Sequence, residues 1–548
     1  MPELSHRRRM LVLAICCMSL LIVSLDNTVL NVALPAMRHD LDASVAGMQW
    51  TIDAYTLVLA SLLMLAGSTA DRIGRRKVFM AGLVLFTMGS ALCSLAPSLE
   101  ALIAFRMVQA VGGCMLNPVA MSIITNTFTD PRERARAIGV WGAVVGISMA
   151  AGPVVGGLLV DSVGWRSIFW VNLPIGIVAL LLTWRYVSES RAPKARRPDP
   201  VGQLLVITLL GSLTYAIIEA PQKGWTSTEI LLFAALAAAS LTGLLVYEPR
   251  RTDPLIDLRF FRSAPFSGAT VIAVSAFAAL GGFLFLNTLY LQDVRGLSAL
   301  GAGLRMLPMA AVVCVLSPFS GRLVASRGPR IPLLGAGIAL AVSGLMFAAF
   351  DAETGTASMF TAYVVFGLGF GAVNAPLTNT AVSGMPRAQA GVAAAVASTS
   401  RQIGQTLGVA VIGAVLAAGV AGAGSSYGDG SAGDFVAASR AAWWIITGCG
   451  VSVLVVGTVS SGRWARETAR RTAERLEESA RAVPGTEAGP PSDPAGAAGP
   501  EGSTSPAGSE GSETSGGPGG SAGPGGSAGS AGPGGAAGQS SASARTRA

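Results

Sequence analysis

Three charged residues interrupt segments of the sequence that are otherwise almost entirely apolar. Asp26 follows the run LVLAICCMSLLIV, Asp53 lies within WTIDAY, and Arg106 lies within FRMVQ. A charged side chain at the centre of a membrane helix costs roughly 2.5–3.5 kcal/mol, so such residues indicate function by default. Two acids beside one arginine leave one carboxylate unbalanced, which is what holding a proton or a cationic ligand requires.

All three residues are predicted to lie at similar depth in the outer half of their helices. We therefore expect Asp26, Asp53 and Arg106 to share a water-filled cleft, because each lowers the burial cost of the others. The charge state of an acid in such a cleft depends on whether water is present, which is the physical requirement for proton coupling. A purely structural interpretation of Asp26 is also open. In it, Asp26 caps nearby backbone groups or pairs with Arg106 only to hold the helices together.

The elements that position these residues follow from composition. Of 548 residues, 51% are hydrophobic and 13% are charged, whereas soluble domains average about 25% charged residues. Apolar runs of this kind indicate spanning helices, since about 20 residues cross ~30 Å of hydrocarbon. We predict an all-α polytopic membrane protein with fourteen spans, at residues 10–33, 48–70, 78–97, 100–127, 137–160, 166–187, 201–220, 229–247, 266–290, 301–324, 331–350, 358–382, 391–419 and 439–461.

An internal repeat divides these spans. Residues 67–76 align with 321–330, and residues 108–117 align with 365–374, each pair eight spans apart. The repeat predicts two six-helix bundles separated by two inserted helices. The expected domains are a cytoplasmic N-terminus (1–9), a first bundle (10–187), a linker with two extra helices (188–265), a second bundle (266–461), an amphipathic helix (462–483) and a disordered tail rich in Gly, Ser, Pro and Ala (484–548).

Basic residues concentrate in alternate loops, such as 7–9, 72–77 and 191–197. The positive-inside rule then predicts a multi-pass protein of the cell membrane with both termini in the cytoplasm.

The fifth span contains GISMAAGPVVGG at 146–157. Pro153 bends a helix and frees a backbone carbonyl, while Gly152, Gly156 and Gly157 give it a smooth face. Generic close packing explains many glycine-rich spans. The combination of a bend with a smooth face favours a helix that leans or slides against a neighbour.

The loop DRIGRRK between spans two and three contains an acid and a glycine that a topology signal alone does not need. An acid at a helix end, a turn-forming glycine and a basic cluster predict a latch to another helix end. The latch residues are Asp71, Arg72, Gly74, Arg75 and Arg76. A simple topological anchor is the alternative.

Together these motifs resemble the signatures of the major facilitator superfamily, specifically its fourteen-span drug:proton antiporters of the EmrB/QacA type. LDNTVLNVALP, GSTADRIGRRK, GPVVGG and RQIGQTLGVAVIG carry the resemblance. It implies a two-bundle transporter that alternates between inward-facing and outward-facing forms. It ties Asp26 and Arg106 to proton coupling, and it ties Asp53 to cationic drugs or protons. Thr69 and Ser148 depart from the usual loop and antiporter motifs.

Polar residues within the spans are expected to line the substrate cavity. They are Asn31, Gln109, Asn117, Asn374 and Arg401. Spans nine to fourteen carry no acid at mid-depth, which disfavours polyvalent cations as substrates. Arg401 either offers positive charge to the cleft or snorkels inward.

These features predict proton-coupled efflux of small amphipathic compounds, as in antibiotic or multidrug export. The alternative on the same fold is a proton-coupled importer of a small metabolite. An enzyme is disfavoured because both histidines, His6 and His39, lie outside the spans and no HExxH motif occurs. A membrane sensor is disfavoured because the tail has no globular content. We expect no metal, no cofactor and no nucleic acid. The protein is expected to function as a monomer in the lipid bilayer. Its expected partners are protons and an amphipathic small molecule.

Overall fold

The structure, a computed structural model, describes residues 5–192, 198–251, 254–383, 385–386, 389–422 and 432–481. All of them belong to one compact unit that covers residues 1–486. The predicted disordered tail, 484–548, lies outside the described residues, as does most of the basic loop at 191–197.

The described residues are almost entirely helical. The first half contains α1 (His6–Leu41), α2 (Val45–Ile73), α3 (Arg75–Ser94), α4 (Leu99–Thr127), α5 (Pro131–Val163), α6 (Ser167–Trp170) and α7 (Asn172–Tyr186). Next come α8 (Pro200–Lys223), α9 (Thr228–Tyr247), and the short helices η1 (Glu248–Arg250) and η2 (Leu258–Arg262). The second half contains α10 (Ala264–Leu289), η3 (Tyr290–Val294), α11 (Ala299–Arg305), α12 (Leu307–Arg327), α13 (Arg330–Ala348), α14 (Thr356–Val382), α15 (Ala390–Gly422), α16 (Ala432–Ser460) and α17 (Arg463–Arg481).

Fourteen segments in this part of the chain are long and apolar enough to cross a membrane, which confirms the predicted number of spans. Two of them are broken. The sixth span is interrupted at Val171 and the tenth at Met306. A proline follows each break, Pro174 and Pro308 respectively. Proline has no N–H to bond the carbonyl four residues earlier, which weakens the helix at the turn where each break occurs.

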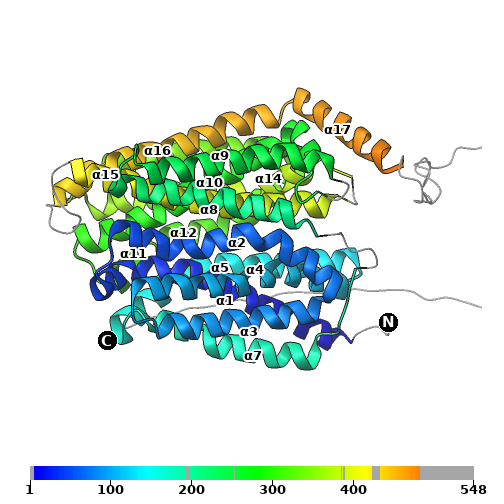
Figure 1. Cartoon of the computed structure of the whole chain (residues 1–548), viewed down its shortest axis with the longest axis horizontal. Helices are drawn as coiled ribbons and strands as arrows, with labels where there is room; N and C mark the ends of the chain where they lie inside the picture. The colour runs from blue at the N-terminus through cyan, green and yellow to red at the C-terminus, as the bar shows by residue number, and fades with distance from the viewer. Residues whose placement is uncertain are drawn as a thin grey trace, which may run out of the picture. The chain divides into compact units, whose positions relative to one another are not determined.

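The two halves have matching internal contacts. In the first half α1 packs on α5, α2 on α4, and α3 on α4. In the second half α10 packs on α15, α12 on α14, and α13 on α14. Figure 1 shows the first half in blue and cyan and the second half in green to orange. This arrangement confirms the predicted all-α fold of two bundles with two inserted helices.

The internal repeat is visible in backbone geometry. Gly74 and its repeat equivalent Gly328 both end a span with a positive φ, +131° and +80°. Gly112 faces the backbone of α3, and its equivalent Gly369 faces α13. Glycine is used at each position because a side chain would be strained or would clash.

The halves meet along two seams. α2 packs against α15, and α5 packs against α11 and α12. The inserted helix α8 packs against both α2 and α15, and Gln203 Nε2 donates a hydrogen bond of 2.6 Å to the Ser61 carbonyl of α2. α8 therefore covers the α2–α15 seam.

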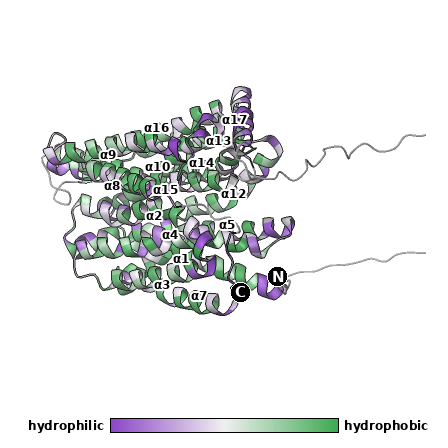
Figure 2. Cartoon of the chain, turned by 45° about the vertical axis from the view of Figure 1, so that its right-hand side comes forward, coloured by the Kyte–Doolittle hydropathy of each residue, from purple (hydrophilic) through white to green (hydrophobic). Residues whose placement is uncertain are grey.

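The predicted amphipathic helix is present as α17. Its buried residues lie on one face, and its other face is charged; the buried set is Ala465, Ala469, Thr472 and Leu476. Figure 2 shows hydrophobic residues over most of the long helices and a strongly hydrophilic α17.

Candidate functional site

A buried ion pair joins α1 to α4. Arg106 Nη1 contacts Asp26 Oδ2, and the two side chains are 0% and 2% exposed. The sequence prediction that Asp26 and Arg106 lie together is therefore correct. In this conformation the pair is shielded from solvent rather than open to a water-filled cleft.

Neutral polar side chains complete the coordination of Asp26. Its Oδ1 accepts hydrogen bonds from Gln109 Nε2 at 2.9 Å and from Asn172 Nδ2 at 3.0 Å. Asn172 and Gln109 also donate to Ser90 Oγ, at 3.0 and 3.3 Å. Arg106 Nη1 donates to Gln109 Oε1 at 2.8 Å. These hydrogen bonds satisfy most of the remaining polar atoms of the pair and so offset part of the cost of burying it.

This geometry corrects the prediction for Gln109. We expected it to line the substrate cavity, but it is fully buried and bridges Asp26 and Arg106. Gln109 lies one helical turn after Arg106 on α4, so both side chains lie on the same face of the helix.

α2 forms one wall of the ion pair. The guanidinium of Arg106 lies 4.1 Å from the ring centroid of Tyr55, and its Nε donates to the Thr51 carbonyl at 3.4 Å. A cation over an aromatic face is electrostatically favourable. Arg106 Nη2 has no hydrogen-bond partner among the described residues.

Asp53 does not join this cluster. Residues two apart on a helix point about 200° apart, since a turn contains 3.6 residues. Asp53 therefore points away from the side of α2 that carries Thr51 and Tyr55. The expectation that all three charged residues share one cleft is wrong for Asp53, whose side chain faces the seam with α15.

The α2–α15 seam around Asp53 is polar and buried. Thr56 Oγ1 lies 3.4 Å from Asp53 Oδ1 and accepts a hydrogen bond of 2.8 Å from Thr406 Oγ1 of α15. One turn earlier, Gln49 Nε2 donates to two backbone carbonyls of α15, at 3.1 and 2.8 Å. Asp53 is 0% exposed, and its Oδ2 has no hydrogen-bond partner among the described residues. A carboxyl group thus lies between the halves, and none of the residues described forms an ion pair with it.

The predicted cavity asparagines lie apart from the ion pair. Asn31 is buried, and its Nδ2 donates to the Asn27 carbonyl at 2.8 Å. Asn117 and its repeat equivalent Asn374 are half-buried. Asn117 Oδ1 has no hydrogen-bond partner among the described residues. Asn31 is thus held by its own helix, whereas the two repeat-related asparagines are more exposed than it is.

Arg401 lies on α15, in the second half. Its Nη2 donates to Thr378 Oγ1 of α14 at 2.5 Å, and its guanidinium lies 5.9 Å from the Phe277 ring centroid. It forms no ion pair with any residue that the structure describes, and its Nε is buried without a partner. Arg401 is therefore a half-buried cation held by one hydroxyl and one aromatic ring.

The glycine motif of α5 contacts both halves. A Cβ on Gly152 would lie 1.9 Å from Thr28 Oγ1 of α1, and one on Gly156 would lie 2.9 Å from Val29 Cγ1. A Cβ on Gly157 would lie 2.5 Å from the Ala299 carbonyl oxygen of α11. The Pro153 carbonyl oxygen would lie 2.2 Å from a Cβ on Gly303, also in α11. Small residues on both sides let α5 and α11 approach closely.

Polar contacts also join the two halves near the ends of α1 and α5. Asp161, four residues after Gly157, accepts hydrogen bonds from the amides of Ala299 and Leu300 at 3.1 and 2.9 Å. Arg38 and Asp293 form an ion pair of 3.2 Å. The loops at the opposite end form no such cross-bundle hydrogen bond among the residues described. The hydrogen bonds that join loop and helix ends of the two halves thus lie at one end, while the α2–α15 and α5–α12 contacts lie further along the helices.

The loop motif binds the end of the sixth span. Asp71 Oδ1 accepts from Arg75 at 3.1 and 2.8 Å. Arg76 N donates to Glu189 Oε1 at 3.1 Å, and Arg76 Nη2 donates to the Trp184 carbonyl at 2.5 Å. Arg72 is exposed, and a Cβ on Gly74 would lie 2.6 Å from Glu189 Oε1. These contacts place the predicted latch within the first bundle.

Four residues of these contacts escaped sequence reasoning. They are Ser90, Asn172, Asp161 and Glu189. Asn172 lies in the motif WRSIFWVNLPIG, two residues before Pro174, and that position was the available signal. Asp161 and Glu189 lie just beyond predicted span ends. Ser90 lies within a span, at a position with no distinctive spacing.

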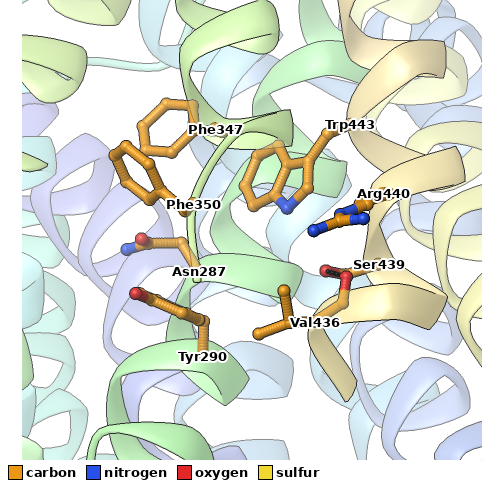
Figure 3. A pocket seen from close by; sticks show the side chains of 8 residues that line it. All are labelled: Asn287, Tyr290, Phe347, Phe350, Val436, Ser439, Arg440 and Trp443. Carbon is orange, nitrogen blue, oxygen red and sulfur yellow. Dashed lines mark hydrogen bonds between the residues drawn. The ribbon is translucent and has the colours of Figure 1, made fainter. Parts of the chain in front are cut away.

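A small cavity lies within the second bundle, away from the ion pair. It has a volume of about 10 Å³ and is lined by aromatic rings, Asn287 and Arg440 (Figure 3). Asn287 Oδ1 accepts from Tyr363 at 2.7 Å, while its Nδ2 has no partner among the described residues. This volume suits one water molecule rather than a substrate. Within the part of the chain that is described, no group of three or more His, Cys, Asp or Glu could hold a metal ion.

Comparison with known proteins identifies the family. The Major Facilitator Superfamily profile matches residues 16–409. The chain is 39% identical over 413 residues to the multidrug resistance protein Stp of Mycobacterium tuberculosis, covering 75% of this chain and 77% of that protein. It is 37% identical over 399 residues to the tetracenomycin C resistance and export protein of Streptomyces glaucescens, covering 72% and 74%. It is 37% identical over 396 residues to the methylenomycin A resistance protein of Streptomyces coelicolor, covering 72% and 82%.

Solved structures share the fold. A bacterial homologue of the human lysosomal transporter Spinster, in an inward-facing and occupied conformation, superposes with a TM-score of 0.60 at 19% identity, covering 86% of this chain and 99% of that one. A point mutant of the nucleoside transporter NupG gives a TM-score of 0.56 at 13% identity, covering 82% and 99%. The chain therefore belongs to the Major Facilitator Superfamily and is a fourteen-span relative of its multidrug and antibiotic resistance proteins.

Proposed function

We propose that this protein exports small amphipathic compounds, such as antibiotics, in exchange for protons. The observation that carries the proposal is the buried pair of Asp26 and Arg106, complemented by Gln109 and Asn172. Its relatives are named as resistance and export proteins of the same superfamily. Such a protein has no need of an enzymatic centre.

Asp26 is the proposed site of proton exchange. In the conformation described, Arg106 neutralises its carboxylate. When the helices separate and water enters, the pair weakens because the surrounding dielectric rises. Asp26 can then take up a proton and release it on return to the closed state.

Asp53 is the proposed second proton site. It lies where α2 and α15 meet, so its surroundings change when the halves move apart. A carboxyl group without a neighbouring cation is stable in a buried seam only in its neutral form, since isolated buried charges are costly. Opening of the seam would allow it to ionise.

We propose that both termini are cytoplasmic, on the distribution of basic residues. The contacts of Asp161 and Arg38 then close the outer side, and the conformation is inward-facing. The substrate would enter between the halves beside Asn117 and Asn374.

Arg401 supports a preference for neutral or anionic compounds. It is a half-buried cation without an acidic partner among the described residues, and it needs compensation when water is excluded. A carbonyl, phenolate or carboxylate on the substrate would supply it.

Transport in everted membrane vesicles tests the function. Inside-out vesicles that carry the protein should accumulate the exported compound when acidified within, and a protonophore should abolish accumulation. The compound is found with a susceptibility panel in a pump-deficient host. A proton-coupled importer would instead move its substrate out of such vesicles.

A further inference from the structure

A cavity of about 230 Å³ lies between η2 and α17, outside the transport site. It is lined by Arg259, Arg262, Thr472, Arg475, Leu476 and Glu478. Three of these six residues are arginines. No part of the transport mechanism uses them.

The walls of this cavity are fixed by packing beneath it. Leu476 is 2% exposed and shares a buried cluster with Phe260 and Phe266. The Ala264 amide donates to Thr468 Oγ1 at 3.1 Å, which joins the start of α10 to α17. α17 is therefore docked by contacts of its own, and the cavity has a defined shape.

Three arginines and one carboxylate, Glu478, line the cavity, so its positive charge is only partly neutralised. Arg259 pairs with Asp257 through three contacts of 2.8–3.2 Å. Arg262 forms no ion pair with any residue described, and its side chain is exposed. A free guanidinium presents a planar fork of donors that suits phosphate oxygens.

The position of the cavity matches the level of lipid headgroups. η2 ends at Arg262, two residues before the α10 span begins, and α17 starts three residues after the α16 span ends. Trp464 is 62% exposed and Phe261 is 40% exposed beside these span ends. Aromatic residues of this kind prefer the membrane interface.

We propose that the η2–α17 cavity binds the phosphate headgroup of an anionic phospholipid such as phosphatidylglycerol. Arg262 and Arg475 bind the phosphate, and Trp464 and Phe261 lie among the first acyl carbons. Basic clusters directly beside a span attract anionic lipid in the same way. The proposal concerns lipid binding alone and does not depend on the proposed transport activity.

Native mass spectrometry of the full-length protein tests this. The protein is equilibrated in mixed phosphatidylglycerol and phosphatidylcholine, and retained lipids are counted. We expect selective retention of phosphatidylglycerol. Arg262→Gln should lower that retention roughly fivefold, the weight of one basic residue near an anionic surface. Adding Arg475→Gln should lower it further.

Arg466→Gln is the matched control, because Arg466 is exposed on α17 but does not line the cavity. An equal loss in this control, or unchanged retention in the double variant with an unchanged melting temperature, would overturn the proposal. Displacement of the lipid by millimolar inorganic phosphate would also overturn it, in favour of a site for free phosphate. Retention that survives phosphate and is lost only in the cavity variants supports it.

Discussion

Asp26 and Arg106 form an ion pair between α1 and α4 with almost no solvent exposure of either side chain. Such a pair seldom stabilises a fold more than well-packed apolar residues of the same size would. Its presence in the centre of a membrane bundle is therefore best explained by a step in which the pair separates. The predictions below distinguish that role from packing.

Replacing Asp26 by Asn should abolish proton-driven export. It also leaves Arg106 buried without a counter-charge, which destabilises a protein by roughly 3–5 kcal/mol. Melting temperature and vesicle transport are measured together. Adding Arg106→Gln should recover the melting temperature but not transport. If the Asp26→Asn variant pumps normally with the same dependence on a pH gradient, Asp26 has only a structural role.

Replacing Asp53 by Asn should not lower the melting temperature, in contrast to Asp26→Asn. No cation lies beside Asp53 among the described residues, so a neutral isostere removes no ion pair. We expect an unchanged or raised melting temperature together with weakened proton coupling, measured as export against an imposed pH gradient. A loss of stability as large as that of Asp26→Asn would contradict the assignment of Asp53 as a neutral seam residue.

Replacing Gly157 by Ala should hinder closure of the seam between α5 and α11. The new Cβ would lie 2.5 Å from the Ala299 carbonyl oxygen, and overpacking of this kind costs about 1–3 kcal/mol. Spin labels at His39 and Glu353 should report a longer distance between the halves. Gly142→Ala on the same helix is the control, since a Cβ there meets nothing within 4 Å. Equal effects of the two changes would argue against a specific contact.

Replacing Gly74 by Ala should destabilise the first bundle more than Gly328→Ala destabilises the second. Both glycines have positive φ, so each change strains the backbone by roughly 1–3 kcal/mol. Only at Gly74 does the new Cβ also meet a side chain, that of Glu189 at 2.6 Å, whereas Gly328 has open space. Thermal unfolding of the two variants measures the difference. Identical melting temperatures would show that the loop contact with Glu189 contributes nothing.

The sequence alone determined the number of spans, the internal repeat and the existence of charged groups in the membrane. These properties follow from local composition: an apolar run long enough to cross the bilayer forms a helix whatever its neighbours are. The repeat also predicted that Gly74 and Gly328 have equivalent places, and their φ angles agree.

The tertiary structure alone decided which charged groups meet. Asp26 and Arg106 are 80 residues apart in sequence, and the sequence placed Asp53 at the same depth as both. The depth of a residue in the membrane follows from its position along one helix. The direction in which its side chain points depends on how that helix is rotated against its neighbours. The packing of α2 between α4 and α15 turns Tyr55 toward Arg106 and Asp53 toward Thr406. That rotation depends on contacts among three helices, and for this reason no single segment could reveal it.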